Sequence, residues 1–209
     1  MKIRNIIWDF DGTLFDTDSA IVSSFLSVLE ERYGVLEAEG KIRSFVKIDT
    51  KYCAKLLSEE HGLEEKSLLS QARENYDQRG IEAQQPFDGA RTCCEKVLEV
   101  GGVNVLITHR DKSSTERFLQ HYGFSDYFSC VLTSDDEFEL KPSSQSFQHA
   151  IEALSLNKVV TCGVGDRELD VGAANGAQID SYFFCPDGTQ CLSATFNIKN
   201  LLDLEARLS

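Results

Sequence analysis

At 209 residues the chain has the length of one domain, or of one domain with an insert, since domains run to about 150 residues. Its apolar and charged fractions, 42% and 26%, are those of an ordinary globular protein and exclude a disordered or fibrous one. The net charge of −13 argues against general binding to nucleic acid or to anionic membranes, because both need a basic surface.

The seven cysteines do not predict a disulfide framework. Their number is odd, no pair has C-x-x-C spacing, and most lie inside apolar runs, so we expect reduced residues of the core. No apolar segment of signal-peptide length precedes Asp9, and no later segment approaches a membrane span. We therefore expect a soluble cytoplasmic protein with neither a membrane nor a nucleic acid as partner.

The first predicted element is the apolar run Ile6-Ile7-Trp8, which stops at Asp9-Phe10-Asp11-Gly12. So continuous a run indicates a parallel strand that is covered on both faces. With a two-residue period, Asp9 and Asp11 point the same way where the strand ends. Like charges at one site raise a pKa or attract a cation, so one carboxylate can act as nucleophile and the other can transfer a proton.

Two simpler interpretations apply to this acidic stretch. A calcium-binding loop needs glycine at its sixth position and Glu at its twelfth, whereas here Gly12 is fourth and Ala20 is twelfth, which excludes it. An ordinary acidic turn stays open on these residues alone, because Asp and Gly are common in turns.

Residues 18–85 show helical periodicity and no clear strand. Possible N-caps at 16–19 precede a stripe that predicts a helix of about four turns ending near Gly34. Further stripes at 52–57 and 68–76 predict helices, and 44–48 is ambiguous.

The pattern changes after the turn at 86–89 to alternating strands and helices. A capping box of Ser113 and Glu116 is expected to open one of these helices. Such alternation predicts an α/β fold, a Rossmann-like parallel sheet with helices on both faces, and the helical segment as an inserted layer. Predicted helices cover 90–98, 113–122 and 147–154, and predicted strands cover 103–107, 130–132, 159–162 and 181–184.

Chemically capable residues follow the predicted strands, and ligands bind at the carboxyl ends of parallel strands. These groups suit phosphoryl transfer, whose main requirement is neutralisation of charge. A lysine and a hydroxyl can hold phosphoryl oxygens, and oxygen ligands without a His or Cys pair favour Mg²⁺ over Zn²⁺. In order along the chain, the candidates are Asp9, Asp11, Thr108, His109, Lys141, Asp166 and Asp170.

Each candidate also has a plain structural explanation. Thr108 alone is an ordinary strand-end hydroxyl, and Lys141 alone is a solvated charge before a helix. Asp166 and Asp170 fit an N-cap and a first-turn acid. A dinucleotide-binding loop at 163–168 would require a third glycine where Glu168 stands. The placement of all of them at successive strand ends favours the catalytic interpretation.

Four segments resemble the motifs of the haloacid dehalogenase-like hydrolases: Asp9-Phe10-Asp11-Gly12-Thr13, Thr108, Lys141-Pro142, and Gly165-Asp166 through Asp170. The resemblance covers the whole chain and is to the subfamily I phosphatases with a helical cap, including phosphoglycolate phosphatase and β-phosphoglucomutase relatives. It implies a core domain of residues 1–17 and 86–209 and a helical cap domain of residues 18–85.

The resemblance also implies a role for each candidate. Asp9 would be the nucleophile that forms a phosphoaspartyl intermediate, and Asp11 the general acid and base. Mg²⁺ would be held by Asp9, Asp166 and the Asp11 carbonyl, with Asp170 supporting the metal or the lysine. Phosphate would be bound by Thr108, His109 and Lys141. His109 departs from the family, where Asn is common, so at this residue the expected contact is through the backbone.

We therefore expect a Mg²⁺-dependent phosphoric monoester hydrolase that acts on a small phosphorylated metabolite, as a monomer or weak homodimer. Within this family the dehalogenases lack the second aspartate and need no metal, so Asp11 makes the chain resemble the phosphatases and phosphomutases. A phosphomutase similar to β-phosphoglucomutase stays open, as does a relative of phosphonoacetaldehyde hydrolase, which needs a cap lysine for a Schiff base. A non-catalytic binding protein on the same fold is a second alternative. Lys41, Lys47, Lys51 and Lys55 are available for the Schiff base. Arg43 and Lys47 lie near a cap turn and could reach an anionic substrate group, although a solvated charged face also explains them.

Overall fold

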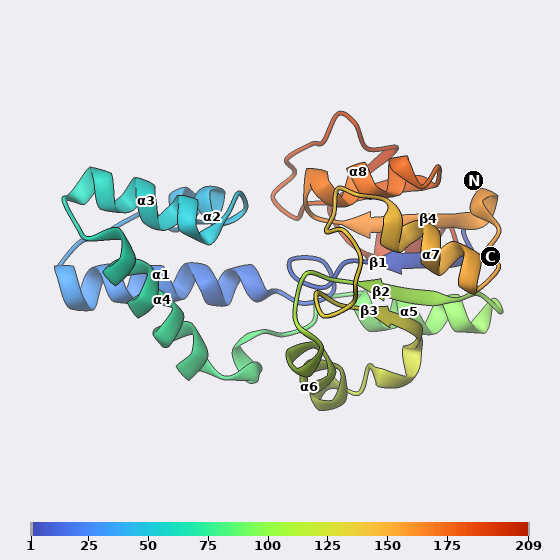
Figure 1. Cartoon of the computed structure of the whole chain (residues 1–209), viewed down its shortest axis with the longest axis horizontal. Coiled ribbons are helices and arrows are strands. Elements are labelled where there is room, and N and C mark those ends of the chain that lie inside the picture. The colour runs from blue at the N-terminus through green and yellow to red at the C-terminus, as the bar shows by residue number, and fades with distance from the viewer. Residues whose placement is uncertain (1, 209) are drawn as a thin grey trace. The chain divides into compact units, whose positions relative to one another are not determined.

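The computed structural model describes residues 2–208, which divide into two compact units (Figure 1). Residues up to Phe15, together with those from Pro86 onward, form what we call the core unit. Asp16–Gln85 form the second, which we call the helical unit. Among the described residues, no helix combines the length and apolar character needed to cross a membrane.

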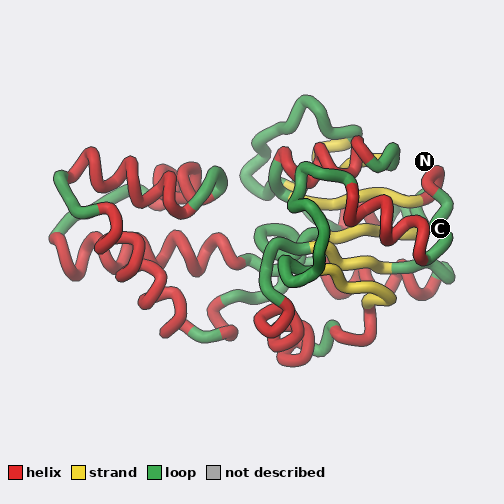
Figure 2. The backbone as a smooth tube through the Cα atoms, in the orientation of Figure 1, coloured by secondary structure: helices red, strands yellow, loops and turns green. Residues whose placement is uncertain are grey.

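A parallel six-stranded sheet organises the core unit, with strand order β3-β2-β1-β4-β5-β6 (Figure 2). Every neighbouring pair of strands is parallel, which confirms the predicted Rossmann-like α/β fold. The order places β1 at the centre, between β2 and β4. The strands are β1 (Asn5–Trp8), β2 (Asn104–Ile107), β3 (Phe128–Leu132), β4 (Thr161–Gly165), β5 (Asp180–Phe184) and β6 (Phe196–Ile198).

Helices cover both faces of this sheet. Ile7 and Val105 pack on one face against α7 and α8 through Phe147 and Ala174. Successive strand residues point to opposite faces, so Asn104 lies on the other face, where its amide donates to the Cys94 carbonyl of α5. The helices of this unit are α5 (Ala90–Glu99), α6 (Lys112–Tyr122), α7 (Gln145–Ala153), α8 (Glu168–Gly176) and α9 (Leu202–Glu205), with short 3₁₀ turns at Ser125–Tyr127 and Lys158–Val160.

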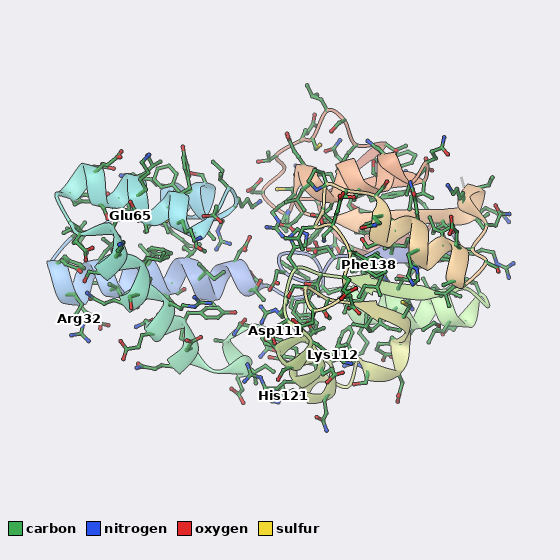
Figure 3. The ribbon with its side chains drawn as sticks, viewed as in Figure 1. Arg32, Glu65, Asp111, Lys112, His121 and Phe138 are labelled. Carbon is green, nitrogen blue, oxygen red and sulfur yellow. The ribbon has the colours of Figure 1, made fainter. Side chains whose placement is uncertain are left out.

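The start of α6, where Asp111 and Lys112 are labelled in Figure 3, differs from the predicted capping box. Asp111 is the N-cap, and its carboxylate accepts the Ser114 N–H at 2.8 Å, so the helix begins at Lys112. The Ser113–Glu116 prediction is therefore wrong by two residues. An aspartate N-cap satisfies an otherwise unpaired N–H group and sets the first turn earlier.

The start of β4 also differs from its predicted position. Asn157 turns the chain by accepting the Val159 N–H at 3.0 Å, so 158–160 form a 3₁₀ turn and the strand begins at Thr161. Gly163 consequently lies inside the strand, where a Cβ would come within 2.7 Å of Ala174 Cβ. Gly163 therefore allows close packing of helix α8 on strand β4, which agrees with the rejection of a dinucleotide-binding loop. The short strand β6 and helix α9 were not predicted.

The helical unit consists of helices, as its periodicity predicts. Asp16 caps α1 by accepting the Ser19 N–H at 3.0 Å, and the helix ends at Gly34, whose φ of 66° is left-handed. The ambiguous residues 44–48 belong mainly to α2. The helices are α1 (Thr17–Tyr33), α2 (Glu39–Val46), α3 (Thr50–His61) and α4 (Glu65–Arg79), followed by a 3₁₀ turn at Ile81–Ala83.

No disulfide joins any of the seven cysteines within residues 2–208. Six are buried and Cys130 is half-buried. Burial raises the pKa of the Cys53 and Cys93 thiols to about 12. They are protonated packing residues at neutral pH, as the sequence predicts.

Candidate active site

The centre of the candidate site is the pair of strand ends β1 and β4. Asp9 follows β1 and is 3% exposed, and Asp166 follows β4. Because these parallel strands are neighbours, their carboxyl ends bring the two carboxylates together. The Thr13 hydroxyl lies between them, 3.3 Å from both Asp9 Oδ2 and Asp166 Oδ1.

Gly12 allows this close approach. Its φ of +75° is left-handed, and a Cβ at this position would overlap the Asp166 carboxylate. Any other residue would therefore be strained and would also displace an acidic group of the site. Glycine at this position therefore has a steric role, because it leaves room for the Asp166 carboxylate.

Lys141 is a buried cation at the centre of the site, not a solvated charge. Its side chain is 1% exposed, and Nζ lies 2.5 Å from Asp9 Oδ1, 2.6 Å from Asp170 Oδ1 and 3.1 Å from the Ile107 carbonyl. Asp9 Oδ1 and the Ile107 carbonyl accept hydrogen bonds from the ammonium group, and Asp170 forms an ion pair with it. Burial lowers the pKa of Lys141, but Asp170 and Asp9 outweigh it and the net pKa is raised. The lysine is therefore charged and orients Asp9.

The acidic groups suit a hard cation. Carboxylate oxygens of Asp9, Asp166 and Asp170 lie within 4.8 Å of one another. Burial raises the pKa of Asp9 to about 6, even though Lys141 opposes the shift. A divalent cation would supply the missing positive charge and favour ionised oxygens, and an all-oxygen donor set fits Mg²⁺ better than Zn²⁺. Asp170 also accepts the Arg167 N–H at 3.1 Å, which orients its carboxylate.

Asp11 has partners different from those of Asp9. Its side chain is 31% exposed, and both of its oxygens accept from Arg110, with Oδ1 2.5 Å from Nη2 and Oδ2 3.3 Å from Nε. The predicted like-charge pair is thus divided between two cations, Lys141 on Asp9 and Arg110 on Asp11. This arrangement lowers the electrostatic cost of placing two carboxylates after one strand.

Thr108 and His109 connect the loops after β2 and β3. The Thr108 hydroxyl accepts the Arg110 N–H at 3.1 Å, and its own N–H donates to the Leu132 carbonyl. His109 Nε2 accepts the Lys141 N–H at 2.9 Å, so its ring supports the loop that carries the lysine. Burial, Lys141 and Arg167 lower the pKa of His109 to about 4. The imidazole is therefore neutral at physiological pH.

We expect the wild-type protein to lose more stability than His109→Gln between about pH 7 and about pH 5. The His109 pKa is lowered from 6.5 to about 4, so in this window the unfolded chain binds a proton here and the folded chain does not. Stability that is fully present above pH 6.5 is lost as the pH falls toward 4. The expected difference is about 1 kcal/mol after discounting for the half-buried ring. Urea unfolding with chelator present measures it, and equal pH slopes for the two proteins would contradict it.

Sequence reasoning missed three residues of the site. Thr13 bridges two carboxylates, Arg110 holds a third, and Arg167 lies near four acids that raise its net pKa despite burial. Thr13 and Arg167 stand inside the segments that carry the family resemblance, and Arg110 follows Thr108 by two residues. The sequence shows where these three residues stand, but it does not show which side chains they contact.

Comparisons with known proteins identify the family of the chain. A family model described as haloacid dehalogenase-like hydrolase matches residues 6–184. The pyrophosphatase PpaX of Halalkalibacterium halodurans is 25% identical over 188 residues, which are 86% of this chain and 82% of that protein.

Solved structures share the fold. A predicted phosphoglycolate phosphatase from Haemophilus somnus has a TM-score of 0.78 at 17% identity and covers 98% of this chain and 97% of its own. The HAD-hydrolase YfnB from Bacillus subtilis, solved with bound magnesium, has a TM-score of 0.73 at 18% identity, with coverages of 99% and 98%.

Proposed function

The chain belongs to the haloacid dehalogenase-like hydrolases, and on that premise we propose that it is a Mg²⁺-dependent phosphatase of small phosphorylated metabolites. The observation that carries the proposal is Asp9, a buried carboxylate held by Lys141 and Thr13 beside Asp166. A nucleophile must be oriented and partly desolvated, and these contacts achieve both.

The chain's own residues divide the proposed reaction into two displacements. An Asp9 oxygen attacks phosphorus, the bond to the leaving oxygen breaks, and Asp11 gives that oxygen a proton. Asp11 then removes a proton from water, whose oxygen attacks phosphorus, and the bond from phosphorus to Asp9 breaks. Inorganic phosphate is released, and both carboxylates return to their starting forms. The Thr108 hydroxyl and the Lys141 charge would stabilise the phosphoryl oxygens.

Asp9, Asp166 and the Asp11 carbonyl would hold the metal ion. The carboxylate oxygens of Asp9 and Asp166 lie within 4.8 Å of each other, and the YfnB structure was solved with bound magnesium, which supports Mg²⁺ as the ion. The ion would supply positive charge that offsets the repulsion between an anionic nucleophile and an anionic substrate. Asp170 would act indirectly, since its carboxylate is engaged by Lys141 and by the Arg167 N–H.

We further propose that residues 18–85, which lie within the helical unit, are the cap domain that selects the leaving group. The PpaX relatives are named as pyrophosphatases, so pyrophosphate is a candidate substrate beside phosphate monoesters. Both share a terminal phosphoryl group, which the core residues recognise, and they differ in the group that leaves.

Mg²⁺-dependent phosphate release is the first expected result. Purified protein is assayed against pyrophosphate, 2-phosphoglycolate, sugar phosphates, nucleoside monophosphates and 4-nitrophenyl phosphate. We expect at least one substrate to be hydrolysed with Mg²⁺ and the rate to fall to background with EDTA, because the buried acids then lack their counter-charge. Readdition of Mg²⁺ should restore the rate. No metal-dependent turnover across this panel would favour the non-catalytic alternative.

Two further measurements separate the alternative enzymes. A phosphomutase would return an isomerised sugar phosphate in place of inorganic phosphate. A phosphonate-cleaving enzyme would be trapped covalently by borohydride with its aldehyde product, because it uses a Schiff base.

A further inference from the structure

Arg110 forms a two-pronged contact with Asp11 across 99 residues of sequence. Nη2 and Nε of the guanidinium each meet one oxygen of the carboxylate, at 2.5 and 3.3 Å. This fork fixes the plane of the Asp11 carboxylate as well as its position, which a single contact would not do.

The guanidinium is itself held from other sides. Its third nitrogen, Nη1, donates to Ser114 Oγ at 2.8 Å, and its central carbon lies 5.1 Å from the Phe10 ring centre and 4.7 Å from that of Phe118. Arg110 is 14% exposed by its side chain, whereas Asp11 is 31% exposed. Arg110 is therefore the more firmly held residue of the pair, and it orients the carboxylate of Asp11.

We propose that Arg110 is a positioning residue that acts through Asp11 and in this way supports breakdown of the phosphoaspartyl intermediate. The inference rests on the proposed function. The fork sets the direction in which the two Asp11 oxygens face, and therefore the position from which Asp11 would remove a proton from water. Each carboxylate oxygen has a second lone pair, so the fork leaves an acceptor for that water.

The test compares wild type with Arg110→Gln, Arg110→Lys, Asp11→Asn and the double variant R110Q/D11N. Quench-flow with 4-nitrophenyl phosphate separates phosphorylation of Asp9 from hydrolysis of the phosphoenzyme, because nitrophenolate leaves without protonation. We expect R110Q to keep the phosphorylation rate and to slow hydrolysis by about 10- to 100-fold, the size of a misplaced catalytic group. R110K should remain slow, since an ammonium cannot form the fork.

The double variant shows whether Arg110 acts through Asp11. If it does, adding R110Q to D11N costs little further rate. An equal fold-loss on both backgrounds, or wild-type hydrolysis by R110Q, would overturn the proposal. Arg117→Gln changes an exposed arginine of α6, the helix that begins two residues after Arg110; it is the matched control and should retain wild-type rates.

A readout without substrate or metal keeps the two proposals separable. In ¹⁵N-labelled protein the Arg110 Nε–H signal, assigned by its loss in R110K, should move in D11N and stay unchanged in the control variant Asp126→Asn. An unchanged signal in D11N would contradict the contact itself. Absence of a phosphoenzyme in wild type would instead contradict the proposed function.

Discussion

Asp9→Asn is expected to abolish phosphate release from every substrate that the wild-type protein hydrolyses. An amide is not a nucleophile toward phosphorus, so the first displacement cannot occur. The variant also loses one ionised ligand of the proposed metal site. Residual turnover should be indistinguishable from the uncatalysed rate, and mass spectrometry should show no phosphoenzyme.

The fold should survive this substitution. Asn has nearly the same shape, and Lys141 keeps its contacts with Asp170 and with the Ile107 carbonyl. Desolvation raises the pKa of Asp9, so the change removes a buried charge that burial disfavours. Circular dichroism should match wild type. Asp126→Asn, an exposed aspartate in the same unit, controls for the chemistry of the change. Turnover by D9N at the wild-type rate would overturn the assignment of the nucleophile.

Lys141→Met is expected to cost about 3–5 kcal/mol of unfolding free energy, as well as nearly all activity. It leaves Asp9 and Asp170 buried, at 3% and 4% exposure, without the ammonium that pairs them. Such carboxylates must take up protons or remain as uncompensated charges. Urea unfolding near neutral pH, with chelator present, measures the loss.

A second substitution tests this electrostatic explanation. Asp170→Asn added to Lys141→Met removes one of the two stranded carboxylates and should restore part of the stability, although not the activity. Lys158→Met changes an exposed lysine and should stay within about 0.5 kcal/mol of wild type. If K141M were as stable as K158M, the buried ion-pair network would contribute little to the fold.

Much of the core unit could be predicted from local pattern. Runs such as Ile6-Ile7-Trp8 must be covered on both faces, and alternation with helices then requires a parallel sheet. Errors arose where one polar side chain sets a boundary, as Asp111 does for α6 and Asn157 for β4. The short strand β6 has three residues, too few to produce a periodic signal.

In the helical unit, too, the sequence predicts the elements but not which side chains contact a ligand. Its helices follow from apolar stripes, and Gly34 and Gly62 end two of them in the left-handed conformation that glycine adopts readily. Which cap side chains would meet a substrate does not follow from such stripes, because the polar face of a helix looks alike whether it binds a ligand or water.

The amino-acid sequence alone was enough to predict which chemical groups gather at the site, because the order of strands brings acids, a hydroxyl and a lysine to one edge of a parallel sheet. The sequence could not predict which side chains of the site pair with one another. These pairs depend on side-chain directions between residues separated by up to 132 positions. They are Lys141 with Asp9 and Asp170, His109 with Lys141, and Arg110 with Asp11. The two-residue period of a strand determines the face of the sheet on which a side chain lies. The partner of that side chain is determined by how neighbouring loops pack together, which only the tertiary structure shows.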